Sequence, residues 1–372
     1  MRRTAGVLVT AVLLTGCAWI GHASESAPPA SVPADLPAES GPYALSRTGR
    51  FATFSSRADN LVPGDTNGAS DVFVKDLADG SIERVSANPL GTYLSPGNAP
   101  PVISDDGKTV LFVTADPGRA IAAGLPGLVV RDRTTHTSRA LHPDVGTIDA
   151  GPFTVEIRHL VLSGDGHTVA FDLEAAVEHH VWSHLGDWTV DLRTGTTRSY
   201  GRGVTITSLT DDGSEAAAIT ASAPAGGAQV LRTADASVVR DFGPGPVMIA
   251  GDGASVARLF LVGSTWHLDR VRVADGAVTP VATNPYLLEL RGISDDGSRI
   301  AGYRARTNDA GVTDGVVWNV SAPTPAIVVG DFARGNPENV AGLGLSGDGR
   351  FVSYVGDGVI VRSVDPRKGP PT

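Results

Sequence analysis

The stretch ISDDGKTVLF, residues 103–112, decides the fold. It places a serine, two aspartates and a glycine between two short apolar runs. Asp-Gly supplies the positive φ angles of a tight hairpin turn, and a hydroxyl or carboxylate ahead of it can accept hydrogen bonds from free amides. The stretch therefore predicts two antiparallel strands joined by a capped turn.

Variants of this turn recur along the chain, and we refer to them as the seven motif turns. They are residues 46–49, 104–107, 163–166, 210–213, 250–253, 294–297 and 346–349. Their glycines are on average 50 residues apart between Gly49 and Gly349. An apolar strand follows each turn, a third strand follows in runs such as DVFVKDL (71–77), and the fourth is polar. A repeat of this length built from short strands predicts the blades of a β-propeller.

These residues resemble the TolB-type, WD-like propeller repeats of exported bacterial proteins, most closely in ALSRTGRFATFSSRADNLVPGDTNGASDVFVKDLADG, residues 44–80. The resemblance implies an all-β fold with a single seven-bladed β-propeller over residues 42–366, and protein or peptide partners. The expected blades start near residues 42, 101, 158, 204, 246, 288 and 340, and residues 367–372 form a tail. A six-bladed ring with one degenerate unit and a pair of β-sandwiches are the alternatives. The chain lacks the additional N-terminal domain of TolB itself.

The last unit contains only three predicted strands. It ends in DPRKGPPT, residues 365–372, whose prolines make a poor fourth strand. An open sheet edge would be exposed to aggregation. We therefore expect a segment between Pro29 and Glu39 to pair as the outer strand of the seventh blade.

The N-terminus has the pattern of a signal peptide. Arg2 and Arg3 precede an apolar run that is too short for a permanent membrane span. The run meets Leu14-Thr15-Gly16-Cys17, which resembles a bacterial lipobox and implies removal of residues 1–16 and lipidation of Cys17. Cys17 is the only cysteine in the chain. The alternative is an ordinary signal peptide cleaved near Ala23.

Residues 17–41 are rich in Ala, Ser and Pro and predict a flexible tether. We therefore expect an exported protein anchored by its lipid to the outer face of the cell membrane. Without residues 1–16 the chain has 28 basic and 40 acidic residues, a net charge of 28 − 40 = −12. This acidity argues against nucleic acid and against electrostatic adhesion to anionic lipid. A monomer is expected.

The connections between strands differ between the two ends of the predicted propeller. All seven motif turns lie at one end and are short. Long connections between second and third strands gather at the other end, at residues 56–70, 115–126, 172–186 and 304–315. Ligand sites are commonly built on variable loops carried by a rigid frame, so this long-connection end is the predicted binding face.

Two groups on this face offer metal-ligand chemistry. Asp65, Asn67 and Asp71 could supply oxygen ligands to calcium, although the sequence leads us to expect no cofactor. The matching loop of unit six, which contains Asp309 and Asp314, keeps the last acid but changes other ligand positions. That comparison favours an Asn-Gly turn capped by aspartate.

His179, His180 and His184 form the densest histidine group and could bind zinc. The preferred interpretation is a polar loop anchored by Trp182 and Trp188, because no matching carboxylate or histidine motif lies nearby in the sequence.

Motifs for known enzyme chemistry are absent. There is no G-x-S-x-G elbow, H-E-x-x-H helix or phosphate loop, and the G-x-G-x-x-G match at 342–347 precedes a strand. The main hypothesis is a non-enzymatic binding module for a protein, peptide or glycan of the cell envelope. The alternative is a metal-dependent propeller hydrolase or lyase, and a third hypothesis is a structural accessory to a membrane sensor or transporter.

Overall fold

The computed structural model describes residues 44–86, 99–115, 118, 120–122, 124–148, 154–177, 181–221, 227–284, 287–305, 313–321, 327–332, 343–356 and 358–364. Their regular structure consists of 27 β-strands with no α-helix. No helix in these residues is long and apolar enough to cross a membrane. The expected all-β fold is confirmed.

The strands form seven antiparallel sheets, and the members of each sheet are consecutive in the chain. The first contains β1 (Phe51–Ser56), β2 (Asp71–Asp76) and β3 (Ile82–Arg84); the second β4 (Val102–Ile103), β5 (Thr109–Thr114), β6 (Gly127–Asp132) and β7 (Thr137–Leu141); the third β8 (Val155–Glu156), β9 (Leu160–Leu162), β10 (Thr168–Val177), β11 (Val181–Asp191) and β12 (Thr197–Gly201); the fourth β13 (Val204–Leu209), β14 (Glu215–Thr220), β15 (Gly227–Arg232) and β16 (Val238–Gly243). The fifth contains β17 (Val247–Ile249), β18 (Ser255–Val262), β19 (Thr265–Arg272) and β20 (Val278–Asn284); the sixth β21 (Leu287–Ile293), β22 (Arg299–Ala305), β23 (Thr313–Asn319) and β24 (Ile327–Phe332); the seventh β25 (Gly344–Leu345), β26 (Phe351–Gly356) and β27 (Gly358–Ser363).

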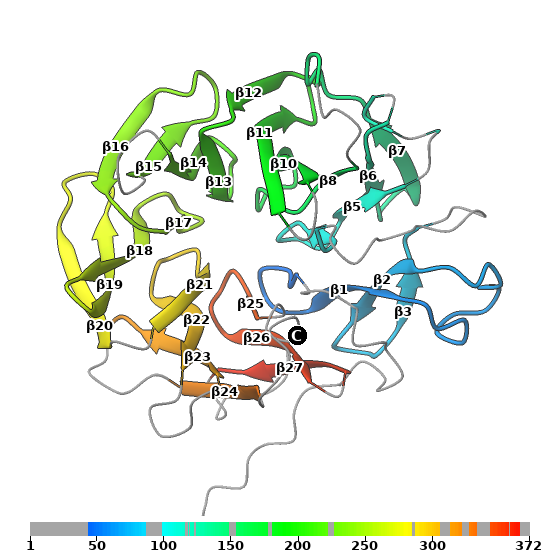
Figure 1. Ribbon diagram of the computed structural model, residues 1–372. Helices are drawn as coiled ribbons and strands as arrows, with labels where there is room; N and C mark the ends of the chain where they lie inside the picture. The colour runs from blue at the N-terminus through cyan, green and yellow to red at the C-terminus, as the bar shows by residue number, and fades with distance from the viewer. Residues whose placement is uncertain are drawn as a thin grey trace, which may run out of the picture.

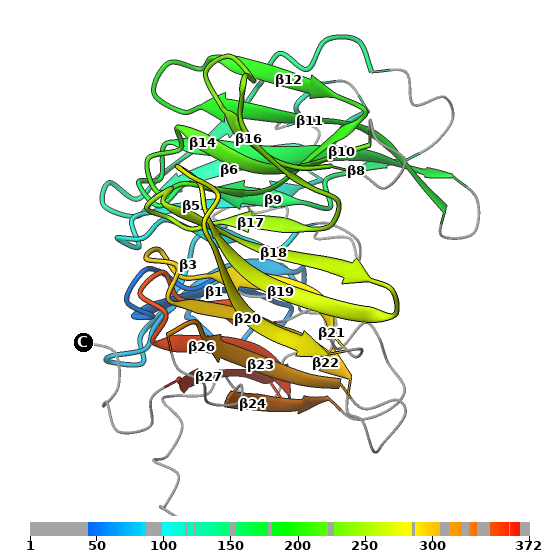
Figure 2. The same ribbon diagram turned by 90° about the vertical axis from the view of Figure 1, so that its left-hand side faces the viewer.

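The sheets stand around a common axis in sequence order, with their first strands toward the centre and their last strands outside (Figure 1). From the side, the successive sheets stack on one another (Figure 2). The second strand of the meander is buried on both faces, as in β5, because each sheet is covered by a neighbour on either side. This explains the unbroken apolar run that follows the turn in the opening stretch.

The motif turns have the predicted geometry. All seven glycines have φ between 65° and 74°. In the turn of the opening stretch, the Ser104 hydroxyl accepts a hydrogen bond from the Thr109 amide at 3.0 Å and donates to Asp106 at 2.8 Å. Asp106 also accepts from the Lys108 amide. Serine and the third-position aspartate thus cap the turn together.

A circle of seven backbone hydrogen bonds joins the motif turns to one another. Each bond links neighbouring turns, with N···O distances of 2.7 to 3.1 Å. The circle begins with the Arg47 amide donating to the Asp105 carbonyl and ends with the Asp348 amide donating to the Arg47 carbonyl. The first and seventh turns are therefore in contact, which fixes the motif-turn end of the ring.

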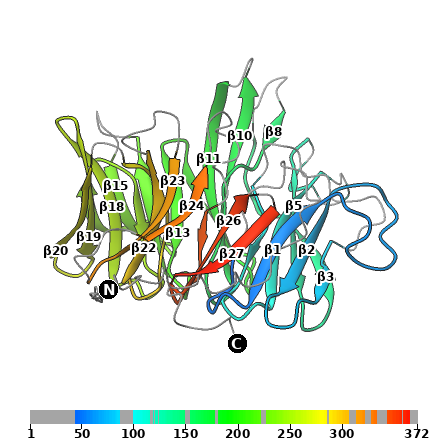
Figure 3. The same ribbon diagram turned by 90° about the horizontal axis from the view of Figure 1, so that it is seen from below.

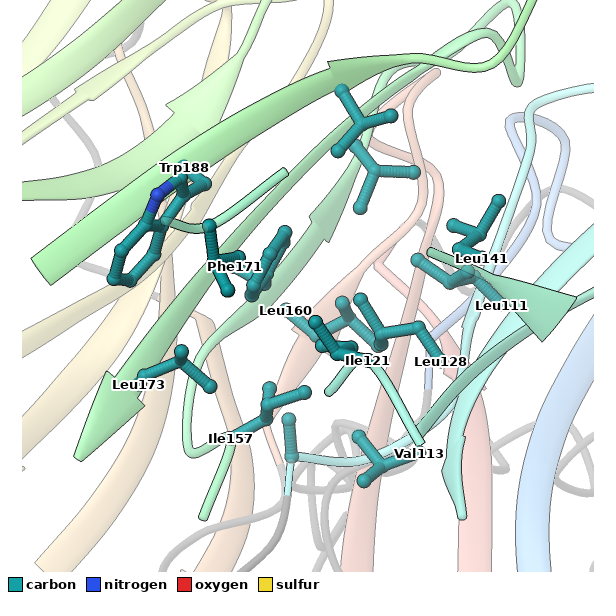
Figure 4. Packing of buried hydrophobic residues seen from close by; sticks show 14 of the residues in the cluster. Leu111, Val113, Ile121, Leu128, Leu141, Ile157, Leu160, Phe171, Leu173 and Trp188 are labelled. Carbon is teal, nitrogen blue, oxygen red and sulfur yellow. The ribbon is translucent and has the colours of Figure 1, made fainter. Parts of the chain in front are cut away.

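Apolar side chains fill the spaces between neighbouring sheets. The largest cluster lies between the second and third sheets, where Leu111 and Leu128 meet Phe171 and Trp188 (Figure 4). Phe171 and Trp188 stack with ring centroids 5.8 Å apart. Burying each such side chain stabilises the fold by about 1.5 to 3 kcal/mol. Trp188 is 3% exposed and lies on β11, so it is a core residue of a strand and the expected polar loop around it is wrong.

The predicted long connection at residues 172–186 is also wrong in form. Most of it belongs to β10 and β11, which pair from Thr168 with Asp191 to Val177 with Val181. This hairpin extends beyond the neighbouring sheets (Figure 3). The ladder continues because a bulge between Leu173 and Glu174 accommodates an extra residue on β11 and keeps the strands paired.

The expected outer strand of the seventh sheet, between Pro29 and Glu39, lies outside the described residues. The described part of that sheet has the three strands β25, β26 and β27. Leu45 bridges Ala52 on the inner side of β1, so the N-terminal stretch from Ala44 supplies the inner edge of the first sheet.

Candidate functional site

Three aspartates and one arginine meet on the axis at the motif-turn end. They occupy the second position of four motif turns, namely Arg47, Asp105, Asp211 and Asp295. One carboxylate oxygen from each aspartate lies within 4.8 Å of the others. Because the four residues belong to the turns of the first, second, fourth and sixth sheets, they converge across the ring rather than along one sheet. We refer to them as the axial acid cluster.

Glycine makes room for these carboxylates. Around the ring the second positions are Arg47, Asp105, Gly164, Asp211, Gly251, Asp295 and Gly347. A Cβ at each of the three glycines would lie within 3 Å of a carboxylate oxygen from the preceding aspartate. Each aspartate therefore leans over the glycine of the next turn. Seven turns cannot alternate strictly between aspartate and glycine, because seven is an odd number. Arg47 occupies the second position of the one turn that is left over.

Arg47 is the counter-charge of the cluster. Its Nη1 lies 3.0 Å from Asp211 and 3.3 Å from Asp105, and its Nη2 lies 3.1 Å from Asp295. The guanidinium is about half exposed, with 48% of its side chain open to solvent, whereas Asp295 is 8% exposed. One positive charge thus faces three carboxylates.

This excess of negative charge changes the titration of the aspartates. Burial, followed by repulsion from Asp211 and Asp105, raises the pKa of Asp295 to about 7. Burial and the charge of Asp211 raise the pKa of Asp105 to about 6, and burial raises the pKa of Asp211. Attraction by Arg47 opposes these shifts without cancelling them. The cluster therefore holds protons near neutral pH.

We predict that Asp295→Asn weakens the pH dependence of stability. An acid whose pKa is higher in the folded state than in the unfolded state binds its proton more tightly when folded. Its contribution to stability is therefore largest below the unfolded-state pKa of about 4 and is lost as the pH rises toward 7. One such group contributes a slope of at most about 1.4 kcal/mol per pH unit. Thermal unfolding of the wild type at pH 5, 6, 7 and 8 should show a declining melting temperature, and the variant should show a shallower decline.

Asp296→Asn is the matched control. Its carboxylate caps the same turn through Ser298 and Ser294, and those hydrogen bonds, working against burial, lower its pKa. Its titration therefore lies below this pH range. The Asp296 variant should lose stability about equally at pH 5 and pH 8, and an unchanged slope in Asp295→Asn would contradict the assignment.

An open depression of about 470 Å³ lies over the axial acid cluster. It is lined by Arg47, Asp105, Asp106, Gly164, Asp165, Asp211 and Asp212. These residues belong to the motif turns of the first four sheets, and the guanidinium of Arg47 lies between the carboxylates. This arrangement is suited to fixing the ring at its narrow end.

A second group of ionisable side chains lies on the third sheet, nearer the long-connection end. Asp172, Glu174 and His184 each offer one ligand atom within 4.8 Å of the others. Asp172 and Asp187 are buried, at 3% and 1% exposure. Burial raises the pKa of Asp172 to about 7 against the backbone hydrogen bonds that it accepts. We call Asp172, Glu174, His184 and Asp187 the third-sheet cluster.

His159 lies near residues of the third-sheet cluster and near residues of the sixth sheet. Its side chain is open to solvent, yet desolvation by surrounding protein lowers its pKa. Arg291 and Glu289 on the sixth sheet are close enough to influence that pKa, in opposite directions. The third and sixth sheets are not neighbours in the ring, so this influence acts through the interior of the ring.

The calcium candidate at Asp65, Asn67 and Asp71 has a different arrangement. Arg84 Nη1 lies 3.0 Å from an Asp65 oxygen and 3.7 Å from Asp71. Asn67 donates to Asp71 at 2.9 Å, and Asn67 Oδ1 accepts from the Ala69 amide. An arginine therefore supplies the positive charge at this loop, which favours the turn interpretation over a cation site.

The remaining candidate residues of the predicted binding face have different outcomes, and some lie outside the described residues. Asp314 is buried on β23 and pairs with Arg304 at 3.2 Å. Asp309, His179 and His180 lie outside the described residues. His184 lies on β11, where two carboxylates of β10 accompany it, so the expectation that no matching carboxylate lies nearby is wrong.

The axial acid cluster was missed because its end of the ring has only short turns. A signal for it was present in the sequence, as the alternation of aspartate and glycine at the second motif position. The third-sheet carboxylates had a weaker signal. Asp172 and Glu174 are two residues apart, which places them on one face of a strand once the segment is assigned as a strand.

Comparison with solved structures supports the propeller fold. An oligogalacturonate lyase in complex with manganese aligns with a TM-score of 0.62 at 14% identity, over 91% of this chain and 93% of that chain. The β-propeller domain of the trilobed protease from Pyrococcus furiosus, described as having an open velcro topology, aligns with a TM-score of 0.53 at 11% identity, over 87% of this chain and 89% of that chain. At such identities the similarity shows the fold alone.

TolB from Acinetobacter baumannii is also similar, with a TM-score of 0.42 at 15% identity over 87% of this chain and 63% of that chain. A score of this size carries no argument about this chain. No protein-family model and no curated protein matches the chain.

Proposed function

We propose that the protein is a seven-bladed propeller, anchored by lipid on Cys17 to the outer face of the cell membrane. In this proposal it acts as a binding module for a charged peptide or glycan of the cell envelope. Seven sheets and the circle of hydrogen bonds between their turns support the blade count. The ligand enters at the long-connection end and reaches the axis there.

One observation carries the binding proposal: side chains of both charges on the third and sixth sheets come close enough within the ring to influence His159. His159 lies near Glu289 and Arg291, which form an ion pair at 3.0 Å, and Arg158 lies 3.8 Å from Glu174. Convergent polar groups of this kind give orientation and specificity to a ligand in a concave site. The mixed charges suit a ligand that has both donors and acceptors.

Affinity capture tests the proposal. The full-length protein in detergent is used to capture partners from envelope extract, and the double variant His159→Ala/Arg291→Met is compared with it. We expect the variant to capture at least tenfold less ligand than the wild type. The control is His267→Ala/Arg272→Met, which removes the same residue types from β19, the third strand of the fifth sheet. Equal loss in both variants, or no loss in either, would contradict the axial site.

A metal-dependent lyase or hydrolase is the second candidate. It is supported by the similarity in fold to a lyase that was solved with manganese, together with the third-sheet cluster of acids and histidine. Mass spectrometry of oligogalacturonate incubated with the protein and Mn²⁺ tests this activity directly. Cleavage that depends on the protein would favour the enzyme over the binding module.

Anchoring is tested separately by Cys17→Ser. Lipidation requires the thiol, and an acidic protein body has little electrostatic attraction to anionic lipid. We expect the wild type to fractionate with membranes and the variant to remain unprocessed or to be found in the soluble fraction. Mass spectrometry of the N-terminus measures the lipid directly. A wild-type protein cleaved near Ala23 and carrying no lipid would refute this part of the proposal.

A further inference from the structure

The bulge in the third sheet places four functional side chains together. Across β10 and β11, Asp172 pairs with Asp187 and Glu174 pairs with His184, and the extra residue Leu185 lies between these pairs. In a regular strand, residues 184 and 187 would point to opposite faces. The bulge shifts the alternation by one residue, so both partners share the face of Asp172 and Glu174.

The Val204 carbonyl and the carboxylate of Asp187 together hold the imidazole of His184 in one orientation and tautomer. The imidazole Nε2 donates to the Val204 carbonyl at 3.2 Å, and Asp187 Oδ1, which accepts no hydrogen bond from the described residues, lies 3.1 Å from the same nitrogen. Nε2 must therefore carry the proton. Asp187 is held in turn by the Ile206 amide at 2.6 Å and is 1% exposed. A carboxylate that orients a histidine in this way is typical of metal sites.

The other imidazole nitrogen of His184, Nδ1, then has a lone pair available on the side of Glu174. His184 Nδ1 lies 3.9 Å from Glu174 Oε1, which is too long for a hydrogen bond. An ion with bonds of about 2.1 Å to each atom bridges a separation of this size after a small closure. Asp172 uses Oδ1 for the amides of Arg158 and His159, and this fixes the carboxylate while leaving Oδ2 for a ligand.

Charge also favours a cation at this position. Asp172, Glu174 and Asp187 carry three negative charges when ionised, and Arg158 lies 3.8 Å from the far oxygen of Glu174. One nitrogen and two carboxylate oxygens form a ligand set for borderline ions, whereas Ca²⁺ and Mg²⁺ prefer oxygen alone. Three protein ligands leave coordination positions open, as in catalytic rather than structural metal sites.

We propose that Asp172, Glu174 and His184 bind one divalent transition-metal ion, such as Mn²⁺ or Zn²⁺, and that Asp187 is a positioning residue for His184. This inference is independent of the proposed function, because the ion can be measured when no other ligand is present. If envelope capture fails and metal binding succeeds, the second candidate function gains support.

Calorimetric titration of metal-stripped, full-length protein with MnCl₂ tests the site. We expect one Mn²⁺ per chain, affinity at least tenfold weaker in Glu174→Gln and in His184→Gln, and about tenfold weaker in Asp187→Asn. Electron spin-echo spectra of bound Mn²⁺ should show coupling to a ligand nitrogen that is lost in His184→Gln. Circular dichroism of the stripped variants checks that they are folded.

Asp211→Asn and Glu289→Gln are the controls, because they remove a carboxylate from the axial acid cluster and from the sixth sheet. Both should bind Mn²⁺ within twofold of the wild type. The proposal is overturned by the absence of stoichiometric binding, by the absence of any nitrogen coupling, or by a loss that appears in Asp211→Asn and not in Glu174→Gln.

Discussion

Arg47→Met should destabilise the protein by about 2 to 3 kcal/mol at pH 8 and by about half as much at pH 5. The substitution keeps much of the side-chain volume and removes the one cation among the described residues that contacts Asp105, Asp211 and Asp295. Removing one partner of a buried ion pair is costly because the other charge stays buried. The guanidinium is half exposed, so solvent screening reduces that cost. At pH 5 the aspartates with raised pKa values are protonated, and less charge is left uncompensated.

Arg50→Met is the control for this prediction. Arg50 lies in the same sheet and has similar exposure, at 44%, but it contacts the single carboxylate of Asp76 at 2.8 Å. Asp76 is buried but still accepts a hydrogen bond from the Ala78 amide, so Arg50→Met leaves one carboxylate without its cation where Arg47→Met leaves three, and it should cost less stability. Urea unfolding at pH 5 and pH 8 measures both variants. If Arg47→Met loses no more stability at pH 8 than at pH 5, the arginine is not the counter-charge of the cluster.

The repeated turn predicted most of the fold because its geometry is local. Gly107 needs a positive φ, and Ser104 and Asp106 cap amides within five residues, so the pattern is visible in a short stretch. The apolar runs after each turn likewise mark strands that are buried on both faces. Long-range information was needed for the extended hairpin. The segment before Asp187 has a polar composition typical of a loop, and only its pairing with β10 makes it a strand.

The sites were harder to predict because they are assembled across sheets. Asp105 and Asp295 are 190 residues apart in the chain, and only ring closure brings them to one guanidinium. His184 was identified as a candidate, but its partners were not. Asp187 becomes a partner through the bulge, and no feature of composition marks where a strand will accommodate an extra residue.

Gly49→Ala should cost about 3 kcal/mol or more, the sum of a strained backbone and a steric conflict. Gly49 has a φ of 72°, a region in which a side chain costs about 1 to 2 kcal/mol. An added Cβ would also lie 2.6 Å from the ring of Phe351, which is fully buried at the start of β26 in the seventh sheet. Overpacking of this kind typically adds about 1 to 3 kcal/mol. The contact joins the first turn to the last sheet, so the substitution tests closure of the ring.

Gly80→Ala separates the two contributions. Gly80 has a φ of 78°, but an added Cβ would have no neighbour within 4 Å, so the expected cost is the backbone strain alone. Gly107→Ala gives the expected loss of stability where two neighbouring sheets are in contact, because its added Cβ would meet Phe51 in the adjacent first sheet. In chemical denaturation, Gly49→Ala should resemble Gly107→Ala and exceed Gly80→Ala by at least about 1 kcal/mol. A cost equal to that of Gly80→Ala would mean that the first and seventh sheets do not pack in solution, since an open ring leaves space beside Gly49.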